Sequence, residues 1–122
     1  MLSVTKTFEF EAAHRLPHYE GPCQNIHGHS YKLEVEISGL VQYKGGEEGM
    51  IVDFVFLKQI VKERVVDKLD HKYLNDILPT PTAENLVLWI YDQIMGWPFL
   101  NQAVARIRLW ETSTSYCEWK KG

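Results

Sequence analysis

The sequence predicts an α+β protein: a four-stranded antiparallel sheet with two helices on one face, in the order strand, strand, helix, helix, strand, strand. Apolar and polar residues alternate in four segments, as expected of half-buried strands, at about residues 3–14, 28–41, 103–111 and 115–120. Apolar residues recur at three- and four-residue intervals in two intervening segments, about 54–67 and 83–96. With 122 residues and 45% hydrophobic content, the chain suits one domain over residues 1–122.

The first two predicted strands each carry histidine on their apolar face. In the first strand His14 closes that face. In the second strand His29 opens it, and His27 has the same parity just before the strand begins. The connecting loop, residues 15–26, contains Pro17, Gly21 and Pro22, which disfavour regular structure. A loop of this length inside a small domain is often functional.

The two helices are predicted from their caps as well as their periodicity. Asp53 is a suitable N-cap for the first helix, and Thr82 is a suitable N-cap for the second. Glu84 lies in the first turn of the second helix, where the helix dipole favours an anion.

The third predicted strand has two different faces. Arg106 and Arg108 point to one side, and Glu111 falls on the other side, together with Ala103, Ala105, Ile107 and Leu109. An antiparallel sheet of this kind has two open edges, and pairing with neighbouring subunits in a ring is one way to cover them.

Composition limits the classes of function. A net charge of −3 argues against general nucleic-acid binding. No apolar run approaches the roughly 18 residues that a membrane span needs, and the N-terminus lacks the pattern of a secretory signal. Cys23 and Cys117 are a poor basis for a disulfide framework, so we expect a cytoplasmic protein with no nucleic-acid or membrane partner.

The three histidines on apolar faces predict a metal site. If the first two strands pair antiparallel, the end of one meets the start of the other, and His14 lies beside His27 and His29. Imidazole suits zinc, and three imidazoles without a clear fourth ligand describe an open, catalytic zinc site. The alternative is a set of partly buried histidines whose ring nitrogens bind backbone carbonyls.

Four other residues have both a chemical and a purely structural interpretation. Cys23 could be a fourth, structural zinc ligand, or a free thiol whose pKa falls near a dication, giving a base or nucleophile. Asp70 and His71 could be a catalytic carboxylate and imidazole if they lie in a loop, or a solvated loop pair. Glu111 could bind a ligand with adjacent N–H donors, or form a salt bridge at a strand end. Cys117 is interpreted as a packing residue.

Six segments, in this order along the chain, resemble the family of 6-pyruvoyltetrahydropterin and 6-carboxytetrahydropterin synthases. They are Phe10 to Leu16, Cys23 to His29, Met50 to Phe54, Leu69 to Asn75, Pro81 to Asn85, and Trp110 to Thr112. The resemblance implies the tunnelling fold, in which trimers close a barrel and two trimers stack as a homohexamer, with each active site between subunits.

The resemblance also implies roles for individual residues. It implies zinc held by His14, His27 and His29, with Cys23 as proton acceptor. It implies that Asp70 and His71 are the catalytic partners of Cys23, and that Glu111 holds the pterin ring of the substrate.

The spacing of Cys23 and His27, with three residues between them, resembles the carboxy-forming branch, which feeds queuosine and other deazapurine synthesis. The implied reaction converts 7,8-dihydroneopterin triphosphate to 6-carboxy-5,6,7,8-tetrahydropterin, acetaldehyde and triphosphate. One alternative is 6-pyruvoyltetrahydropterin synthesis from the same substrate. Another is a non-catalytic zinc-binding module with Cys23 as fourth ligand. The triphosphate requires local cations, and the candidates are Arg15, Lys32, Arg106 and Arg108.

Overall fold

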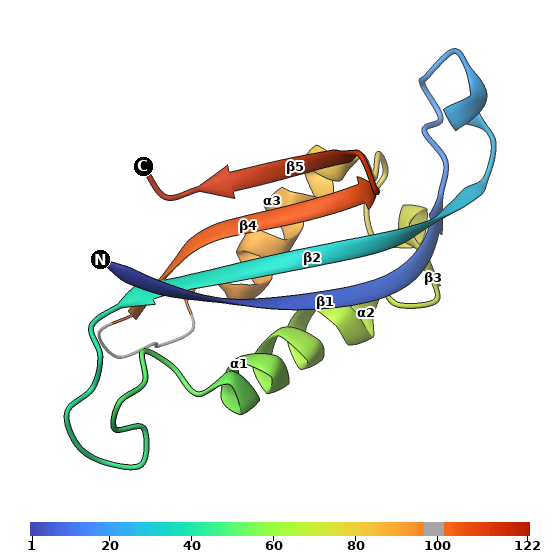
Figure 1. Ribbon diagram of the computed structural model, residues 1–122. Coiled ribbons are helices and arrows are strands. Elements are labelled where there is room, and N and C mark those ends of the chain that lie inside the picture. Colours follow the sequence, from blue (N-terminus) through green and yellow to red (C-terminus); the bar gives the residue numbers. More distant parts are fainter. Residues whose placement is uncertain (97–101) are drawn as a thin grey trace.

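Four strands of the sheet pair antiparallel, as predicted. The computed structural model describes residues 1–96 and 102–122 and orders the strands β3-β1-β2-β4-β5 (Figure 1). The antiparallel strands are β1 (Leu2–His14), β2 (His27–Gly39), β4 (Gln102–Thr112) and β5 (Ser115–Lys120). The predicted strand count is incomplete, because β3 (Lys72–Tyr73) pairs parallel with Ala12 and Ala13 of β1. A strand of two residues is too short to show alternation in the sequence.

The helical segments also follow the prediction, with one interruption. In place of the predicted helix 54–67 the structure has α1 (Phe54–Val61), a π-helical segment (Lys62–Val66) and α2 (Asp67–Leu69), which ends two residues later than predicted. The predicted helix 83–96 is α3 (Ala83–Ile94). Both predicted caps are confirmed: Asp53 accepts a hydrogen bond from the Val55 amide at 2.9 Å, and Thr82 accepts one from the Asn85 amide at 3.1 Å.

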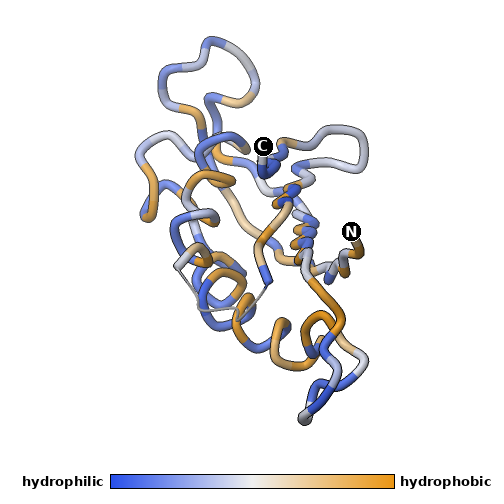
Figure 2. Tube along the Cα trace, turned by 90° about the vertical axis from the view of Figure 1, so that its left-hand side faces the viewer, coloured by the Kyte–Doolittle hydropathy of each residue, from blue (hydrophilic) through white to orange (hydrophobic). Residues whose placement is uncertain are grey.

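The core lies between the sheet and the helices, which cover one of its faces (Figure 1). Along helices and strands the hydropathy alternates, as expected of elements with one buried side (Figure 2). Buried apolar side chains come from both layers, including Leu33, Val35, Ile37, Leu57, Val65, Leu86, Ile90, Ile107 and Leu109. Within the described part of the chain, no helix has the length and apolar character needed to cross a membrane.

The predicted faces of β4 are wrong at residues 103–105, because the strand contains a β-bulge there. Glu36 of β2 pairs with Arg106, but the next residue, Ile37, pairs with Val104, so Ala105 is passed over. Val104, only 5% exposed, therefore takes the buried side that simple alternation assigned to Ala103 and Ala105, both of which are half-buried.

Candidate metal centre and active site

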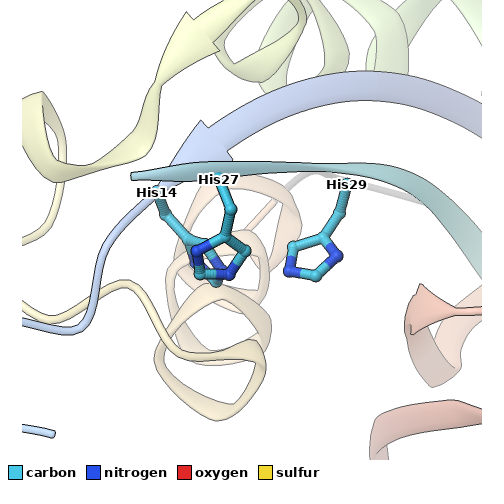
Figure 3. A group of neighbouring side chains, drawn as sticks. All are labelled: His14, His27 and His29. Atoms are coloured by element: carbon cyan, nitrogen blue, oxygen red, sulfur yellow. The ribbon is translucent and has the colours of Figure 1, made fainter. Parts of the chain in front are cut away.

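Three imidazoles converge at one end of the sheet. The antiparallel register places His14, the last residue of β1, opposite His27, the first residue of β2, as predicted. His29 projects from the same side of β2 one pleat further on (Figure 3). One nitrogen from each ring lies within 4.8 Å of the other two, so the group could hold a metal ion.

The hydrogen bonds of two imidazoles fix which nitrogen is free. Nδ1 of His14 lies 2.8 Å from the carbonyl oxygen of Pro81, and Nδ1 of His27 lies 2.7 Å from that of Asn25. A carbonyl only accepts, so both Nδ1 atoms carry the proton and both Nε2 atoms present a lone pair when the rings are neutral. These Nε2 atoms are 3.1 Å apart. Two lone pairs at that distance need a proton or a cation between them.

The third imidazole has an unsatisfied nitrogen in the same place. Nε2 of His29 is buried and has no hydrogen-bond partner within the described residues. Burial lowers the pKa of His29, the Glu111 carboxylate opposes this, and His14 and His27 lower the pKa further. A neutral ring with an orphaned nitrogen is the form that binds metal.

These observations fit a metal better than a set of histidines satisfied by carbonyls. The carbonyls satisfy the Nδ1 atoms of His14 and His27, but leave their Nε2 atoms facing each other. Ligating histidines typically donate their second ring N–H to a carbonyl or carboxylate in this way. Imidazole nitrogens are borderline ligands that suit zinc, and three of them leave a position open for water or substrate.

Cys23 does not belong to the group of converging donor atoms that the described residues form. It lies in a short 3₁₀ turn, Pro22–Gln24, in the loop beyond the ends of β1 and β2 (Figure 1). The Leu16 amide donates to the Cys23 carbonyl at 2.8 Å, which folds this loop back toward the end of β1. The half-buried thiol is free. The geometry of one chain therefore favours the free-thiol interpretation over a fourth, structural ligand.

Glu111 lies beside the histidines, at a second bulge. β5 pairs with Trp110 and with Thr112 but passes over Glu111, and such bulges re-aim a side chain. The Glu111 carboxylate is 28% exposed and lies 3.8 Å from Nε2 of His29. That is too long for a hydrogen bond, so the carboxylate keeps its acceptor capacity. It lines a hollow of about 430 Å³ with Leu16, Thr82, Ala83, Glu84, Ser115, Tyr116 and Cys117.

Asp70 and His71 form the expected pair in the expected loop. The Asp70 carboxylate lies 3.0 Å from Nδ1 of His71 and accepts the Glu11 amide at 3.0 Å. The Glu11 hydrogen bond holds the pKa of Asp70 below its usual value, and His71 adds to the effect. His71 has a φ of 59°, and its side chain is 78% exposed. Among the described residues, no hydrogen bond or ion pair joins this pair to Cys23 or to the histidine cluster.

Two of the four residues predicted to bind the triphosphate form ion pairs with glutamates instead. On the sheet face away from the helices, Arg106 binds Glu36 at 2.8 Å and Arg108 binds Glu118 at 2.7 Å. Glu34 lies within ion-pair distance of both arginines. Lys32 is exposed, and Nε of Arg15 is buried without a hydrogen-bond partner in the described chain.

Some residues that shape the cluster were not predicted from the sequence. The carbonyls of Pro81 and Asn25 set the imidazole tautomers, and main-chain groups leave no trace in side-chain patterns. Tyr31, 1% exposed, lies under the cluster with its hydroxyl 3.5 Å from Nδ1 of His14, and burial raises its pKa. Its place on the apolar face was readable from the sequence, but its contact with His14 was not.

Fold and site together define a class of protein: an α+β sheet domain with three histidines at one end of the sheet that could hold a metal ion. Residues 3–121 match the 6-pyruvoyl tetrahydropterin synthase family, and the chain belongs to that family. The resemblance inferred from the six sequence segments is thereby confirmed.

Individual relatives agree with this assignment. The chain is 35% identical to the 6-carboxy-5,6,7,8-tetrahydropterin synthase of Haemophilus influenzae, over 99% of this chain and 100% of that one. It is 40% identical to the 6-pyruvoyl tetrahydrobiopterin synthase of Dictyostelium discoideum, over 79% of this chain and 71% of that one. The structure of the Caenorhabditis elegans 6-pyruvoyl tetrahydropterin synthase superposes with a TM-score of 0.81 at 25% identity, covering 99% of this chain and 96% of that one. This likeness confirms the tunnelling fold for the single chain.

Proposed function

We propose that the protein is a zinc-dependent lyase that converts 7,8-dihydroneopterin triphosphate to 6-carboxy-5,6,7,8-tetrahydropterin, acetaldehyde and triphosphate. The observation that carries the proposal is the histidine cluster, in which two Nε2 lone pairs and a third, orphaned Nε2 converge in a member of this family. The proposed setting is the cytoplasm, in queuosine or other 7-deazapurine synthesis.

The choice of product rests on two supports. The Haemophilus influenzae relative, which aligns over its whole length, is named a 6-carboxy-5,6,7,8-tetrahydropterin synthase. The gap of three residues between Cys23 and His27 also resembles the carboxy-forming branch. The Dictyostelium discoideum relative, at 40% identity, is named for the pyruvoyl product, so that product is the competing outcome.

The residues of the site suit the proposed chemistry. Zinc held by His14, His27 and His29 would supply a Lewis acid that polarises substrate oxygens and acidifies the neighbouring C–H bond. Cys23, as the thiolate, would accept the carbon-bound proton. The Asp70–His71 pair would move a second proton, with Asp70 orienting the imidazole through Nδ1.

Substrate recognition is assigned to Glu111. Its carboxylate has two acceptor oxygens and no hydrogen bond to His29, and it faces a hollow of about 430 Å³. A pterin offers two adjacent donors, the 2-amino group and the neighbouring ring N–H, which match a carboxylate in a bidentate arrangement. Because Arg106 and Arg108 are paired with glutamates, we assign the triphosphate to cations other than these two.

The proposal includes a site shared between subunits of a homohexamer. Within one chain the described contacts leave the Asp70–His71 pair separate from Cys23 and the histidines, and the outer strand β5 has an open edge. Sedimentation should give a mass about six times the 14.2 kDa of the chain.

A complementation experiment tests the shared site. The inactive Cys23→Ala and His71→Ala proteins are dissociated, mixed and reassociated, and part of the activity should return. Absence of any recovery in mixed hexamers would place all catalytic residues of a site in one subunit.

The decisive experiment is incubation of the zinc-loaded protein with 7,8-dihydroneopterin triphosphate and identification of the products by mass. Release of acetaldehyde together with a 6-carboxy pterin is the expected result. A 6-pyruvoyl product without acetaldehyde would assign the chain to the other branch. Stoichiometric zinc binding with no turnover of this substrate would support a non-catalytic zinc module.

A further inference from the structure

The segment that follows α2 runs beside the end of β1. It binds β1 through main-chain hydrogen bonds and also through side chains that take the place of strand partners. At its start, the His71 amide donates to the Glu11 carbonyl at 2.6 Å, and the Glu11 amide donates to the Asp70 carboxylate at 3.0 Å. Next, Lys72 and Tyr73 form the two-residue strand β3 with Ala12 and Ala13. The segment therefore follows β1 as far as the residue before the metal-site histidine.

Asn75 extends this pairing past His14. Its Oδ1 accepts the Arg15 amide at 2.9 Å, and its Nδ2 donates to the Arg15 carbonyl at 2.9 Å. One side-chain amide thus binds both main-chain groups of the residue that follows His14, as a paired strand would. An amide is the side chain suited to this, because it offers a donor and an acceptor side by side.

The same connection also holds the His14 ring. Asn75 lies in a 3₁₀ turn, Leu74–Asp76, and five residues after that turn the chain reaches Pro81, whose carbonyl accepts the Nδ1 proton of His14. Asn75 therefore holds the backbone of Arg15, the residue next to His14, and Pro81 sets the tautomer and ring orientation of His14. A ligand held in place before the metal arrives loses less conformational freedom on binding.

We propose that Asn75 is a positioning residue for the metal ligand His14, and that segment 70–75 couples metal binding to the Asp70–His71 pair. The inference rests on the proposed function in one respect only, namely that the histidine cluster is a metal site. The coupling follows from the row of hydrogen bonds between segment 70–75 and the end of β1, here called the ladder. Asp70 and His71 bind Glu11 at one end of the ladder, and Asn75 binds Arg15 at the other. Such coupling is reciprocal, so zinc binding must stabilise these hydrogen bonds by the same free energy by which the hydrogen bonds strengthen zinc binding.

The first test measures the zinc dissociation constant by competition with a chromogenic chelator at neutral pH. Asn75→Ala removes both hydrogen bonds, and we expect zinc binding weaker by about tenfold to a hundredfold, the usual effect of losing a group that orients a ligand. Asn75→Asp keeps the acceptor for the Arg15 amide but sets an oxygen against the Arg15 carbonyl. It should also weaken zinc binding.

The matched control is Gln42→Ala. Gln42 is also a side-chain amide that donates to a main-chain carbonyl, that of Ile51 at 3.3 Å, but it lies beyond the far end of β2. This variant should lose about as much thermal stability as Asn75→Ala but keep the wild-type zinc affinity. Wild-type affinity in either folded Asn75 variant, or an equal loss in Gln42→Ala, would overturn the positioning role.

The second test uses the wild-type protein and does not depend on how the variants fold. Hydrogen exchange of the Arg15 and His71 amides, which donate to Asn75 and Glu11, should slow by about tenfold when zinc is added. The Gln42 amide, which donates to Met50, should not change. If zinc binds and neither the Arg15 nor the His71 amide slows, the coupling is wrong.

The two proposals fail in different ways. A wild-type protein that does not retain zinc would refute the metal centre, and this inference with it. A protein that retains zinc but does not convert the pterin would refute the proposed reaction alone. Equal zinc affinity in the wild type and the Asn75 variants would refute this inference and leave the proposed function standing.

Discussion

Replacing Glu111 by glutamine tests the substrate class separately from the metal. The substitution keeps the shape of the side chain but replaces one carboxylate oxygen with an NH₂ group. Where the carboxylate would accept two parallel hydrogen bonds from a pterin, the amide accepts one and sets its own N–H against a ligand N–H. The bulge that places Glu111 should persist, because it is a property of the backbone pairing.

The size of the effect follows from the surroundings of the carboxylate. A hydrogen bond to a charged group is worth about 1.5–3 kcal/mol, and an opposed donor adds to that loss. The Glu111 side chain is 28% exposed, so water can compensate part of it. We therefore expect a loss of roughly 2–3 kcal/mol in pterin binding, which corresponds to about 30- to 150-fold.

The assay is calorimetric titration with an unreactive pterin, accompanied by turnover measurements. Glu48→Gln makes the same change of charge in an exposed turn before α1 and should bind the pterin as the wild type does. Zinc content and oligomer mass of Glu111→Gln should be unchanged. Pterin affinity and turnover within about twofold of wild type would mean that Glu111 does not hold the ring, and the assignment would lose its recognition element.

Two further predictions concern the metal ligands and the Asp70 carboxylate. His27→Ala should abolish zinc retention, whereas Cys23→Ala should retain stoichiometric zinc and lose turnover; loss of zinc from Cys23→Ala would make the thiol a ligand. The pKa of Asp70 is depressed below its usual 3.8, chiefly by the Glu11 amide, so its contribution to stability is present above about pH 4 and is lost as the pH falls through the lower, folded-state value. Carbon-detected titration of the Asp70 carboxyl should show this depression, and an unshifted midpoint would mean that the hydrogen bond from Glu11 does not persist in solution.

Much of this architecture is determined by local sequence. Alternation over β1 and β2 placed His14, His27 and His29 on one face, because side chains in a strand repeat every second residue whatever the strand pairs with. The caps at Asp53 and Thr82 were predictable for a similar reason, since the donor and acceptor lie within three residues of each other.

Other features were decided by the tertiary structure alone. The bulges at Ala105 and Glu111 arise from how β4 pairs with its neighbours, so the alternation of β4 itself gave the wrong buried residues at 103–105. The tautomer of His14 depends on the carbonyl of Pro81, 67 residues away, and the clamp on Arg15 depends on Asn75, 60 residues away. A local pattern reports periodicity along one strand, whereas these contacts exist only once distant segments have packed together.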